Sequence, residues 1–283
     1  MQNRSLINKH VAITGASGGL GRALCEKILE NGGALTVIDR NPKKQAALIE
    51  SLRATFPDAA IEGLLADMED FESVKALAET LKTRPVDYLI LNAGAYSIPR
   101  HKTALGLDNV FTINFVSPYF LTRALLPGIE ARGGRVIAVG SIAHNYAKSD
   151  AEDEDFSTRE RASLVYGNAK RHLMAAFFAL AAKGKDVSVT HPGISFTGIT
   201  AHYPKLIFAL IRHPMKIIFM KPKKAALSIY EGLFTQTAFG EWIGPRFFDV
   251  WGMPKKKKLR TITAAEQKRL AEYAERLYTE ICE

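Results

Sequence analysis

The sequence of 283 residues predicts an α/β protein: a three-layer, doubly wound parallel sheet with helices on both faces. Short apolar runs alternate along the chain with longer segments in which apolar residues recur at helical spacing. Turns containing glycine or proline separate these segments, and 47% of the residues are hydrophobic, enough for one large core. Because such sheets bind ligands at the carboxyl ends of their strands, the polar motifs that follow each strand are the candidate functional residues.

The elements follow one another in a regular order, and no repeat or low-complexity linker interrupts them. The predicted strands are 11–13, 34–38, 59–65, 86–91, 134–139, 187–190 and 241–245. The predicted helices are 22–30, 42–56, 70–82, 104–127, 223–238 and 264–281. We therefore expect a single domain over residues 1–283, with an insertion at 199–224 and a basic loop and C-terminal surface helix at 255–283.

A glycine-rich stretch, residues 14–21, connects the first strand to the first helix. Glycine lets the backbone turn tightly and approach a pyrophosphate, and the start of the helix offers free N–H groups to that anion. Strand, glycine loop and helix form the context that a dinucleotide-binding fingerprint needs. We predict that a cofactor contacts Gly15, Ser17, Gly19, Leu20 and Gly21.

Asp39 and Arg40 follow the second strand, and they favour different cofactors. The Asp39 carboxylate can accept hydrogen bonds from both ribose hydroxyls of the adenosine half, and it repels a 2′-phosphate. Arg40 could instead attract that phosphate. The sequence favours NAD, because the carboxylate would have to be neutralised before a phosphate could bind there. NADP remains the alternative.

The glycine spacing after a threonine resembles that of the short-chain dehydrogenase/reductase family. Further motifs of that family follow in its order: Asn92-Ala93-Gly94, Ser141, the pair Tyr166-x-x-x-Lys170, and Pro192-Gly193. The resemblance covers roughly residues 8–250. It implies a Rossmann-type domain that transfers a hydride between NAD(P) and an alcohol or carbonyl.

Ser141, Tyr166 and Lys170 are the candidate catalytic residues. A hydroxyl just past a strand can hydrogen-bond a substrate carbonyl oxygen as charge develops on it. Tyr166 and Lys170 are one helical turn apart, and a nearby ammonium favours the phenolate and thus lowers the tyrosine pKa. The resemblance adds Asn114 as the residue that holds a water beside the lysine, whereas its alternative role is that of a hydrogen-bonded core asparagine.

The resemblance also completes the predicted cofactor site. It implies that Asp67 and Met68 lie against the adenine ring, although Asp67 could instead cap the next helix. Backbone near Ile194 and the Thr197 hydroxyl would hold the nicotinamide carboxamide, and Thr197 could also be only a helix cap. The further predicted contacts are Asn92, Ala93, Gly94, Tyr166, Lys170, Pro192 and Gly193.

The segment between Ser141 and Tyr166 is long and carries an acidic run, 150–155. It resembles the retinol dehydrogenase/protochlorophyllide reductase-like branch, which acts on large apolar carbonyls or alcohols, or reduces a pigment, and usually prefers NADP. In that segment His144 is expected to be a loop residue rather than a catalyst. The resemblance implies that residues 199–224 form a lid that covers the substrate. Because this segment is apolar and basic, we expect that substrate to be hydrophobic. A pair of packed helices or contact with a membrane surface are the alternatives to a lid.

Composition limits the class of protein further. The net charge is +9, but basic residues are dispersed except for 255–258, which we expect to be a solvated loop. Nuclear targeting or contact with an anionic membrane is the alternative for this run, and nucleic acid is not an expected partner. Two cysteines without a pairing motif, no signal peptide and no apolar run of about 18 residues predict a cytoplasmic protein. The seven histidines lack ligand spacing, so no metal site is expected. A homo-oligomer is compatible with the sequence.

Two other functions remain open at this point. A non-catalytic dinucleotide-binding regulator or scaffold could use the same fold, because a fold does not fix function. A membrane-peripheral enzyme that acts on lipid or retinoid-like carbonyls is the second alternative.

Overall fold

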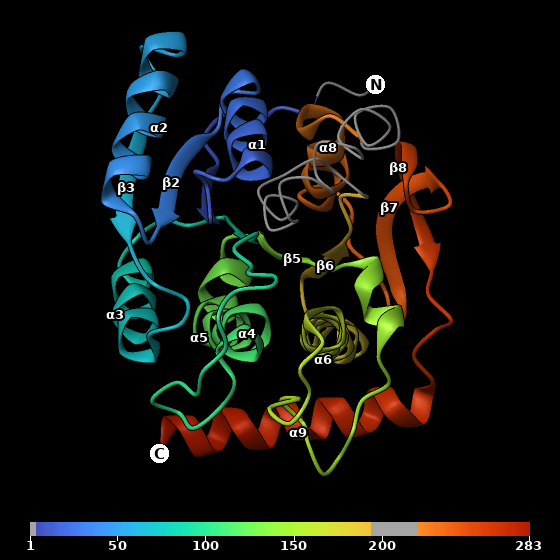
Figure 1. The fold of residues 1–283 in the computed structure, drawn as a ribbon. Coiled ribbons are helices and arrows are strands. Elements are labelled where there is room, and N and C mark those ends of the chain that lie inside the picture. The colour runs from blue at the N-terminus through green and yellow to red at the C-terminus, as the bar shows by residue number, and fades with distance from the viewer. Residues whose placement is uncertain (1–3, 194–219) are drawn as a thin grey trace, which may run out of the picture.

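The computed structural model describes residues 4–193 and 220–283, and their strands form one eight-stranded sheet (Figure 1). The strand order is β3-β2-β1-β4-β5-β6-β7-β8. All neighbouring strands pair in parallel except β7 and β8, which are antiparallel. The strands are β1 (His10–Thr14), β2 (Ala34–Asp39), β3 (Ile61–Leu65), β4 (Tyr88–Leu91), β5 (Arg135–Val139), β6 (Val187–Thr190), β7 (Glu241–Phe247) and β8 (Trp251–Lys258).

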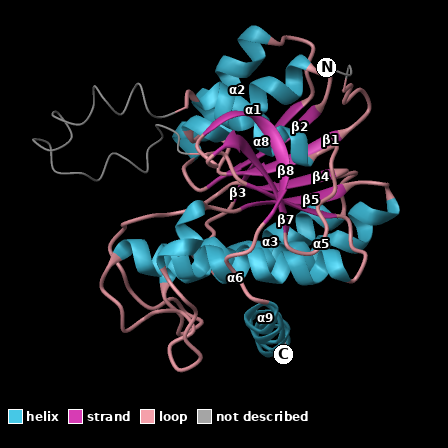
Figure 2. Ribbon diagram, turned by 90° about the vertical axis from the view of Figure 1, so that its right-hand side faces the viewer, coloured by secondary structure: helices cyan, strands magenta, loops and turns pink. Residues whose placement is uncertain are grey.

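Helices cover both faces of the sheet, which confirms the predicted three-layer, doubly wound fold. Helices α1, α2 and α8 lie on one face, and α3, α5 and α6 lie on the other, with α9 outside α5 and α6 (Figures 1 and 2). The helices are α1 (Gly19–Glu30), α2 (Pro42–Thr55), α3 (Phe71–Lys82), α4 (Asn109–Phe111), α5 (Ser117–Ala131), α6 (Ala162–Ala182), α8 (Pro222–Gly232) and α9 (Ala264–Cys282).

The central strands are short apolar runs because they are covered on both faces. In β1, for example, Val11, Ala12 and Ile13 are all fully buried. The strand order reverses between β1 and β4, so the loops after these two strands diverge to opposite faces of the sheet. The crevice between the two loops is the place where doubly wound sheets bind ligands.

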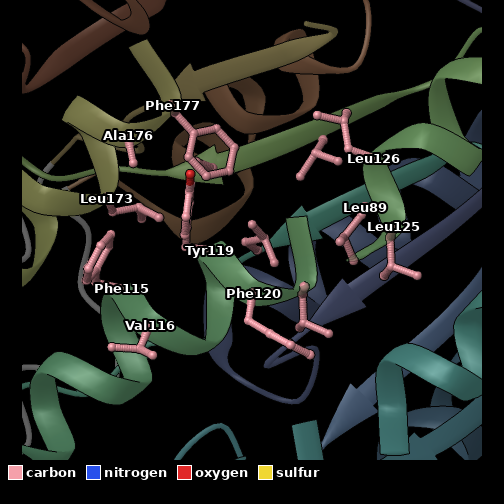
Figure 3. Packing of buried hydrophobic residues seen from close by; sticks show 14 of the residues in the cluster. Leu89, Phe115, Val116, Tyr119, Phe120, Leu125, Leu126, Leu173, Ala176 and Phe177 are labelled. Carbon is pink, nitrogen blue, oxygen red and sulfur yellow. The ribbon is translucent and has the colours of Figure 1, made fainter. Parts of the chain in front are cut away.

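The larger part of the core lies between the sheet and the layer of α3, α5 and α6. Leu89 of β4 packs there with Tyr119, Phe120 and Leu125 of α5, and with Phe177 of α6 (Figure 3). Burying a side chain of this size contributes about 1.5–3 kcal/mol relative to leaving it in water. This packing fixes α5 and α6 against the strand ends. Helix α6 contains Tyr166 and Lys170, and Asn114 lies in the turn just before α5.

The predicted helix 104–127 is wrong at its first turn. Residues 103–107 form a turn in which the Thr103 N–H donates to the Leu107 carbonyl (2.8 Å), and Gly106 has φ +74°. The helix begins only after Asp108, whose side chain accepts hydrogen bonds from the N–H groups of Val110 and Phe111. An N-cap carboxylate of this kind decides where a helix starts, whatever the apolar spacing before it.

Two further boundaries differ from prediction. Helix α8 ends at Gly232, six residues earlier than expected. Glycine has a low helix propensity, so Gly232 favours the end of the helix at this position. The predicted solvated loop at 255–258 is wrong: these lysines form the second half of strand β8. An edge strand has one open side, and lysine is a residue that natural sheets place on such edges to prevent pairing with other chains.

Candidate functional site

The glycine-rich loop between β1 and α1 is packed too closely for side chains. Gly15 has φ +66°, and a Cβ there would lie 2.9 Å from the Ala93 Cα. A Cβ at Gly21 would lie 2.4 Å from the Gly15 carbonyl oxygen, whereas one at Gly19 would meet nothing within 4 Å. The loop therefore leaves open space at Gly19, directly in front of the helix.

The N-terminus of α1 is suited to an anion. Its N-cap residue, Gly18, makes no side-chain capping hydrogen bond, and no acidic residue lies in the first turn. Helix N-terminal N–H groups without such a cap, together with the positive end of the helix dipole, bind phosphate groups. The predicted contacts Gly19, Leu20 and Gly21 form this first turn. The geometry fits the pyrophosphate of a dinucleotide.

Asp39 ends β2 and turns toward the same loop. Its carboxylate accepts hydrogen bonds from the Ser17 backbone N–H (3.1 Å) and from the Ser17 hydroxyl (2.8 Å). Burial raises the pKa of Asp39, and these two hydrogen bonds oppose that rise. The structure thus brings Ser17 and Asp39 together, at the end of a strand where a ribose would lie.

Arg40 and Asp67 lie beside this position on the protein surface. The Arg40 guanidinium is 3.9 Å from the Asp67 carboxylate, and both side chains are exposed. Asp67 is not the cap of α3: that role belongs to Asp70, which accepts hydrogen bonds from the first N–H groups of the helix. Asp67 is therefore open to a ligand. Met68 is buried, and its carbonyl accepts a hydrogen bond from Ser117 at the start of α5 (2.7 Å).

The stretch after β4 joins the glycine loop to the catalytic side of the site. The Asn92 amide donates to the carbonyls of Thr14 and Gly15 (3.0 Å each), and the Ala93 N–H donates to the Thr14 hydroxyl. At Gly94, a Cβ would lie 2.8 Å from Asn114 Oδ1 and 3.8 Å from Lys170 Nζ. These two predicted residues therefore face the same small space.

Asn114 lies in a π-helical turn, Thr112–Val116, between α4 and α5. Such turns are rare and concentrate at functional sites. The side chain is fully buried, and its amide donates to the carbonyls of Ala95 (2.9 Å) and Val110 (2.8 Å). Its Oδ1 atom has no hydrogen-bond partner among the described residues. A buried acceptor without a partner is costly, so Asn114 is suited to a water or a ligand group.

The carboxyl end of β5 and the first half of α6 bring Ser141, Tyr166 and Lys170 together. The side chains of Ser141 and Tyr166 are hydrogen-bonded. The Lys170 ammonium donates to the carbonyl of Val139, the last residue of β5 (2.9 Å), and lies 5.7 Å from the centre of the Tyr166 ring. The three predicted residues thus form one cluster at the carboxyl edge of the sheet.

Burial opposes the predicted lowering of the Tyr166 pKa, which relies on Lys170 and an oxidised nicotinamide together. Burial raises the pKa of Tyr166 to about 12, and the hydrogen bond with Ser141 only partly opposes that rise. Burial also lowers the pKa of Lys170 to about 8. The phenol is therefore protonated near neutral pH, which suits a proton donor.

A cavity of about 680 Å³ opens beside this cluster. Its lining includes Tyr96, whose ring packs edge-on against Tyr166 with centroids 5.4 Å apart. The other lining residues are Tyr146, Arg161, Ala162, Ser163 and Leu164. A second cavity, of about 690 Å³, lies between α6 and α9, and none of the predicted site residues line it. The predicted site residues line neither cavity, but the first one reaches Tyr166 through the ring of Tyr96.

The predicted contacts after β6 are described only in part. Pro192 and Gly193 lie at the carboxyl end of β6, and Gly193 has φ +81°. Ile194 and Thr197, together with residues 199–219 of the predicted lid, lie outside the described residues.

Sequence reasoning missed a polar network behind Ser141. His144 is buried in a 3₁₀ turn and contacts the Ser141 carbonyl (2.6 Å) and the Thr261 hydroxyl (2.7 Å). The buried Arg171 guanidinium donates to the carbonyls of His144 and Thr261 and to both carboxylate oxygens of Glu266. His144 thus holds the turn after Ser141 to the C-terminal segment, and its expected non-catalytic role stays a prediction. A signal was present in the sequence: Arg171 lies between Lys170 and His172, directly before a long apolar run of the same helix.

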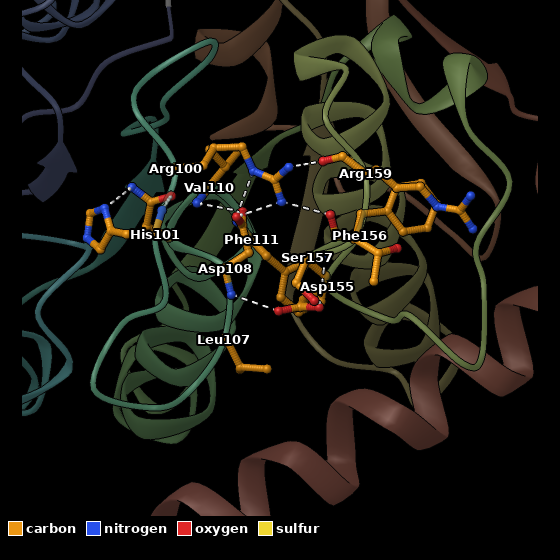
Figure 4. Close-up of polar contacts among 12 residues, drawn as sticks. Arg100, His101, Leu107, Asp108, Val110, Phe111, Asp155, Phe156, Ser157 and Arg159 are labelled. Carbon is orange, nitrogen blue, oxygen red and sulfur yellow. Dashed lines mark hydrogen bonds and ion pairs between the residues drawn. The ribbon is translucent and has the colours of Figure 1, made fainter.

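A second missed network holds the start of the helix that carries Asn114. Arg100 forms an ion pair with the buried Asp108 (2.8 Å) and donates to the Phe156 carbonyl (Figure 4). The Asp108 N–H donates to the Asp155 carboxylate (2.7 Å). The long acidic segment after Ser141 therefore fixes the Asn114 helix, in addition to separating two catalytic residues.

Comparison with known proteins agrees with this arrangement. A family model described as short chain dehydrogenase matches residues 9–151, just over half of the chain. The chain belongs to the short-chain dehydrogenase family. It is an NAD(P)-dependent oxidoreductase that acts on CH–OH or C=O groups.

Curated relatives confirm the resemblance to the retinol dehydrogenase-like branch of the family. Polyprenol dehydrogenase of Mus musculus is 27% identical over 232 residues, which cover 77% of this chain and 69% of the relative. Retinol dehydrogenase 12 of Mus musculus is 28% identical over 205 residues, which cover 70% and 65%. The chain thus spans about two thirds of the length of these short-chain dehydrogenases.

Solved structures share the fold. An uncharacterized protein from Mycobacterium paratuberculosis superposes with a TM-score of 0.74 at 24% identity, covering 97% of this chain and 95% of that one. NADPH-dependent 3-quinuclidinone reductase from Rhodotorula rubra gives a TM-score of 0.63 at 22% identity, covering 83% and 88%. At these identities the likeness concerns the fold alone.

Two general features complete the description of this short-chain dehydrogenase. In the described ranges, no group of three or more histidine, cysteine or carboxylate side chains could hold a metal ion. No helix of those same ranges is both long and apolar enough to cross a bilayer.

Proposed function

We propose that this short-chain dehydrogenase interconverts an apolar alcohol and its carbonyl compound with Tyr166 as general acid and base. The observation that carries the proposal is the convergence of Ser141, Tyr166, Lys170 and Asn114 at one strand edge. The nicotinamide cofactor supplies or accepts the hydride when bound. The protein supplies the position of the substrate and the path of the proton.

Each of these residues has a distinct task in the reduction direction. Ser141 donates a hydrogen bond to the substrate carbonyl oxygen, as charge develops there. Tyr166, which is protonated because burial raises its pKa to about 12, gives its proton to the same oxygen. Lys170 and the unpartnered Oδ1 of Asn114 face one small space, where a water can pass a proton onward to the tyrosine.

Replacement of Tyr166 by phenylalanine tests this role. We expect kcat to fall by about 10²–10⁴, the usual contribution of general acid–base catalysis, with a much smaller change in NADH affinity. Tyr88→Phe, at the amino end of β4, is the matched control and should retain full activity. A panel of apolar ketones and alcohols, followed by cofactor absorbance, provides the measurement. Full turnover by Tyr166→Phe would contradict the assignment. Wild-type protein that binds NADH but turns over none of these substrates would favour the alternative, a non-catalytic dinucleotide-binding regulator.

We propose NAD rather than NADP as the preferred cofactor. The support is Asp39, whose buried carboxylate lies at the end of β2 and already accepts two hydrogen bonds from Ser17. A 2′-phosphate beside it would meet a like charge in a poorly solvated place. Arg40 does not offset this, because its guanidinium is directed to Asp67 on the surface.

The apolar character of the substrate is supported by the walls of the cavity beside Tyr166. Tyr96, Tyr146 and Leu164 provide aromatic and aliphatic surface there. The relatives named polyprenol dehydrogenase and retinol dehydrogenase 12 point in the same direction. A cytoplasmic location is also part of the proposal, because both cysteines are free thiols and Cys282 is exposed, which suits a reducing compartment.

A further inference from the structure

The turn between β7 and β8 exposes an aromatic side chain from a strained backbone. The Val250 N–H donates to the Phe247 carbonyl (3.0 Å), and the two residues between them, Phe248 and Asp249, have φ of +52° and +57°. Such a turn favours asparagine and glycine, and a bulky residue with positive φ is an outlier. Phe248 is nevertheless there, and 85% of its surface is exposed. Strain of this kind, kept at an exposed position, points to a function.

Phe248 is the centre of an apolar tip on this hairpin. Phe247, Trp251 and Met253 are also exposed, and Phe247 pairs with Trp251 across the two strands. The tip holds four of the eight large hydrophobic side chains that are exposed in the described part of the chain. Contiguous exposed apolar surface on a folded protein marks a site of interaction.

Cations follow directly behind the apolar tip. Lys255, Lys256 and Lys258 are exposed on β8, and Arg246 and Arg260 extend the basic surface. The nearby carboxylates are already neutralised: Glu241 pairs with Lys256 (3.2 Å), and Asp249 pairs with Lys257. The hairpin therefore combines an apolar end with a net positive strand.

This combination fits one partner better than the others. A second copy of the chain would place lysines opposite lysines along the edge strand, which is unfavourable. Single-stranded nucleic acid favours aromatic rings interleaved with cations along one groove, whereas here the rings gather at one end. An anionic bilayer accepts aromatic rings at its interface and attracts cations to its headgroups.

The hairpin adjoins the mouth of the candidate active site. Strand β7 is parallel to β6, so its carboxyl end, Phe247, lies at the same edge of the sheet as the catalytic residues. A Cβ on Gly193, in the turn after β6, would lie 2.9 Å from the Pro245 ring and 3.0 Å from the Val250 carbonyl oxygen. The turn end of the hairpin therefore lies close to the turn after β6, which is expected to hold the nicotinamide.

We propose that the β7–β8 hairpin docks this enzyme on an anionic phospholipid membrane, with its aromatic tip in the interface and its lysines on the headgroups. The active-site edge of the sheet then faces the bilayer, which is the source of an apolar alcohol or carbonyl substrate. This inference rests on the proposed function for the substrate class, but the docking itself rests only on the hairpin.

Sedimentation with vesicles of phosphatidylcholine and phosphatidylserine tests the docking. The wild-type chain should sediment with these vesicles and be released by salt, because surface charges are screened. Phe248→Asn suits the turn better than phenylalanine, so the variant should fold at least as well and yet bind at least about tenfold more weakly. Lys255→Glu combined with Lys258→Glu should cause a similar loss.

Matched controls lie on other surfaces. Ile7→Ser removes an exposed apolar side chain (67% exposed), and Lys82→Glu with Lys268→Glu removes two exposed cations of α3 and α9. Both controls should bind as the wild type does. The proposal is overturned if the wild-type chain stays in the supernatant or if the hairpin variants sediment unchanged. Hairpin-dependent binding of a single-stranded oligonucleotide, or a hairpin-dependent dimer in light scattering, without vesicle binding would also overturn it.

NADH fluorescence and turnover of a water-soluble ketone, measured on the same samples, separate the two proposals. If the chain binds the cofactor and turns over substrate but does not bind vesicles, only the docking proposal is wrong. Vesicle binding that depends on the hairpin, by a chain that binds no nicotinamide cofactor, would support the docking and remove the proposed function.

Discussion

Burial shifts the pKa values of Tyr166 and Lys170 in opposite directions from their ordinary values. Burial raises the pKa of Tyr166 to about 12 and lowers the pKa of Lys170 to about 8. Tyr166 therefore stays protonated throughout the range in which the Lys170 ammonium is lost. The alkaline limit of the reaction is then set by the lysine.

The rate of carbonyl reduction should accordingly fall as the pH rises, with a midpoint near pH 8, because Lys170 loses its proton there. In Lys170→Arg this fall should disappear, because a guanidinium stays protonated, although the maximum rate is lower. Alcohol oxidation should rise with pH, because that direction needs the phenolate of Tyr166. A pH–rate profile of both enzymes in both directions is the measurement. An alkaline midpoint that Lys170→Arg leaves in place would contradict the assignment.

Individual site residues could be predicted where the motif and the strand end coincide. The glycine loop, Asp39 and the Tyr166–Lys170 pair follow strands or start helices that apolar patterns reveal, so their meeting at one edge was predictable. The contacts of His144 were not predictable, because its partner Thr261 is 117 residues further along the chain. Only the packing of the C-terminal segment brings these two side chains together.

The helix that carries Asn114 depends on its cap. Asp108 is buried, accepts two N–H groups of the first turn and pairs with Arg100. Asp108→Ala should lower the free energy of unfolding by on the order of 2–3 kcal/mol, because it removes the cap and leaves a half-buried guanidinium without its charge partner. Asp108→Asn keeps an acceptor suited to an N-cap, so its loss should be about half as large. Urea unfolding of the three proteins provides the comparison, and equal losses in the two variants would show that the cap contributes nothing.

Helix α9 is tied to the catalytic helix α6 by Glu266. Burial of Glu266 opposes its ionisation, but hydrogen bonds from Arg171 and Ser149 outweigh this effect and lower its pKa to about 2. Since this pKa is depressed by folding, the pair stabilises the protein fully above about pH 4.5. The contribution is lost as the pH falls from there toward 2.

Glu266→Gln should therefore cost on the order of 2 kcal/mol of unfolding free energy at pH 7, and the difference from wild type should vanish as the pH falls from 4.5 to 2. Denaturant unfolding over that pH range is the measurement. Glu272→Gln, at an exposed carboxylate of the same helix, is the control and should change nothing. A difference that stays constant down to pH 2 would mean that the loss at pH 7 does not come from the charge of Glu266.

Elements were predictable to the extent that they are buried. Strands β1, β2, β4, β5 and β6 are buried along most of their length and appear in the sequence as apolar runs, whereas β3 is partly exposed at the opposite edge of the sheet. Strand β8 was missed because it is an exposed edge, where lysines replace the apolar pattern. The turn before it was equally hidden, because Phe248-Asp249 lacks the Asn-Gly signature of a tight hairpin.

At the scale of the whole molecule, residues 251–283 complete a fold that the first 250 residues specify. Strand β8 extends the sheet at one edge, and α9 crosses the outer surface of α5 and α6 (Figures 1 and 2). Tyr273 of α9 packs against Phe111 and Phe115, close to the π-helical turn that contains Asn114. The predicted surface helix is thus a support for the catalytic layer of the molecule.

The proposed hydride transfer requires a dinucleotide that spans the sheet edge from Asp39 to Lys170. Titration of the purified protein with NADH and with NADPH, followed by nicotinamide fluorescence, tests this most directly. Wild type should bind NADH at least about tenfold more tightly than NADPH, since the buried Asp39 carboxylate repels the 2′-phosphate. Asp39→Ser should narrow that ratio, because the variant removes the carboxylate that repels the 2′-phosphate. Tighter NADPH binding by wild type would contradict the role of Asp39, and binding of neither cofactor would contradict the account entirely.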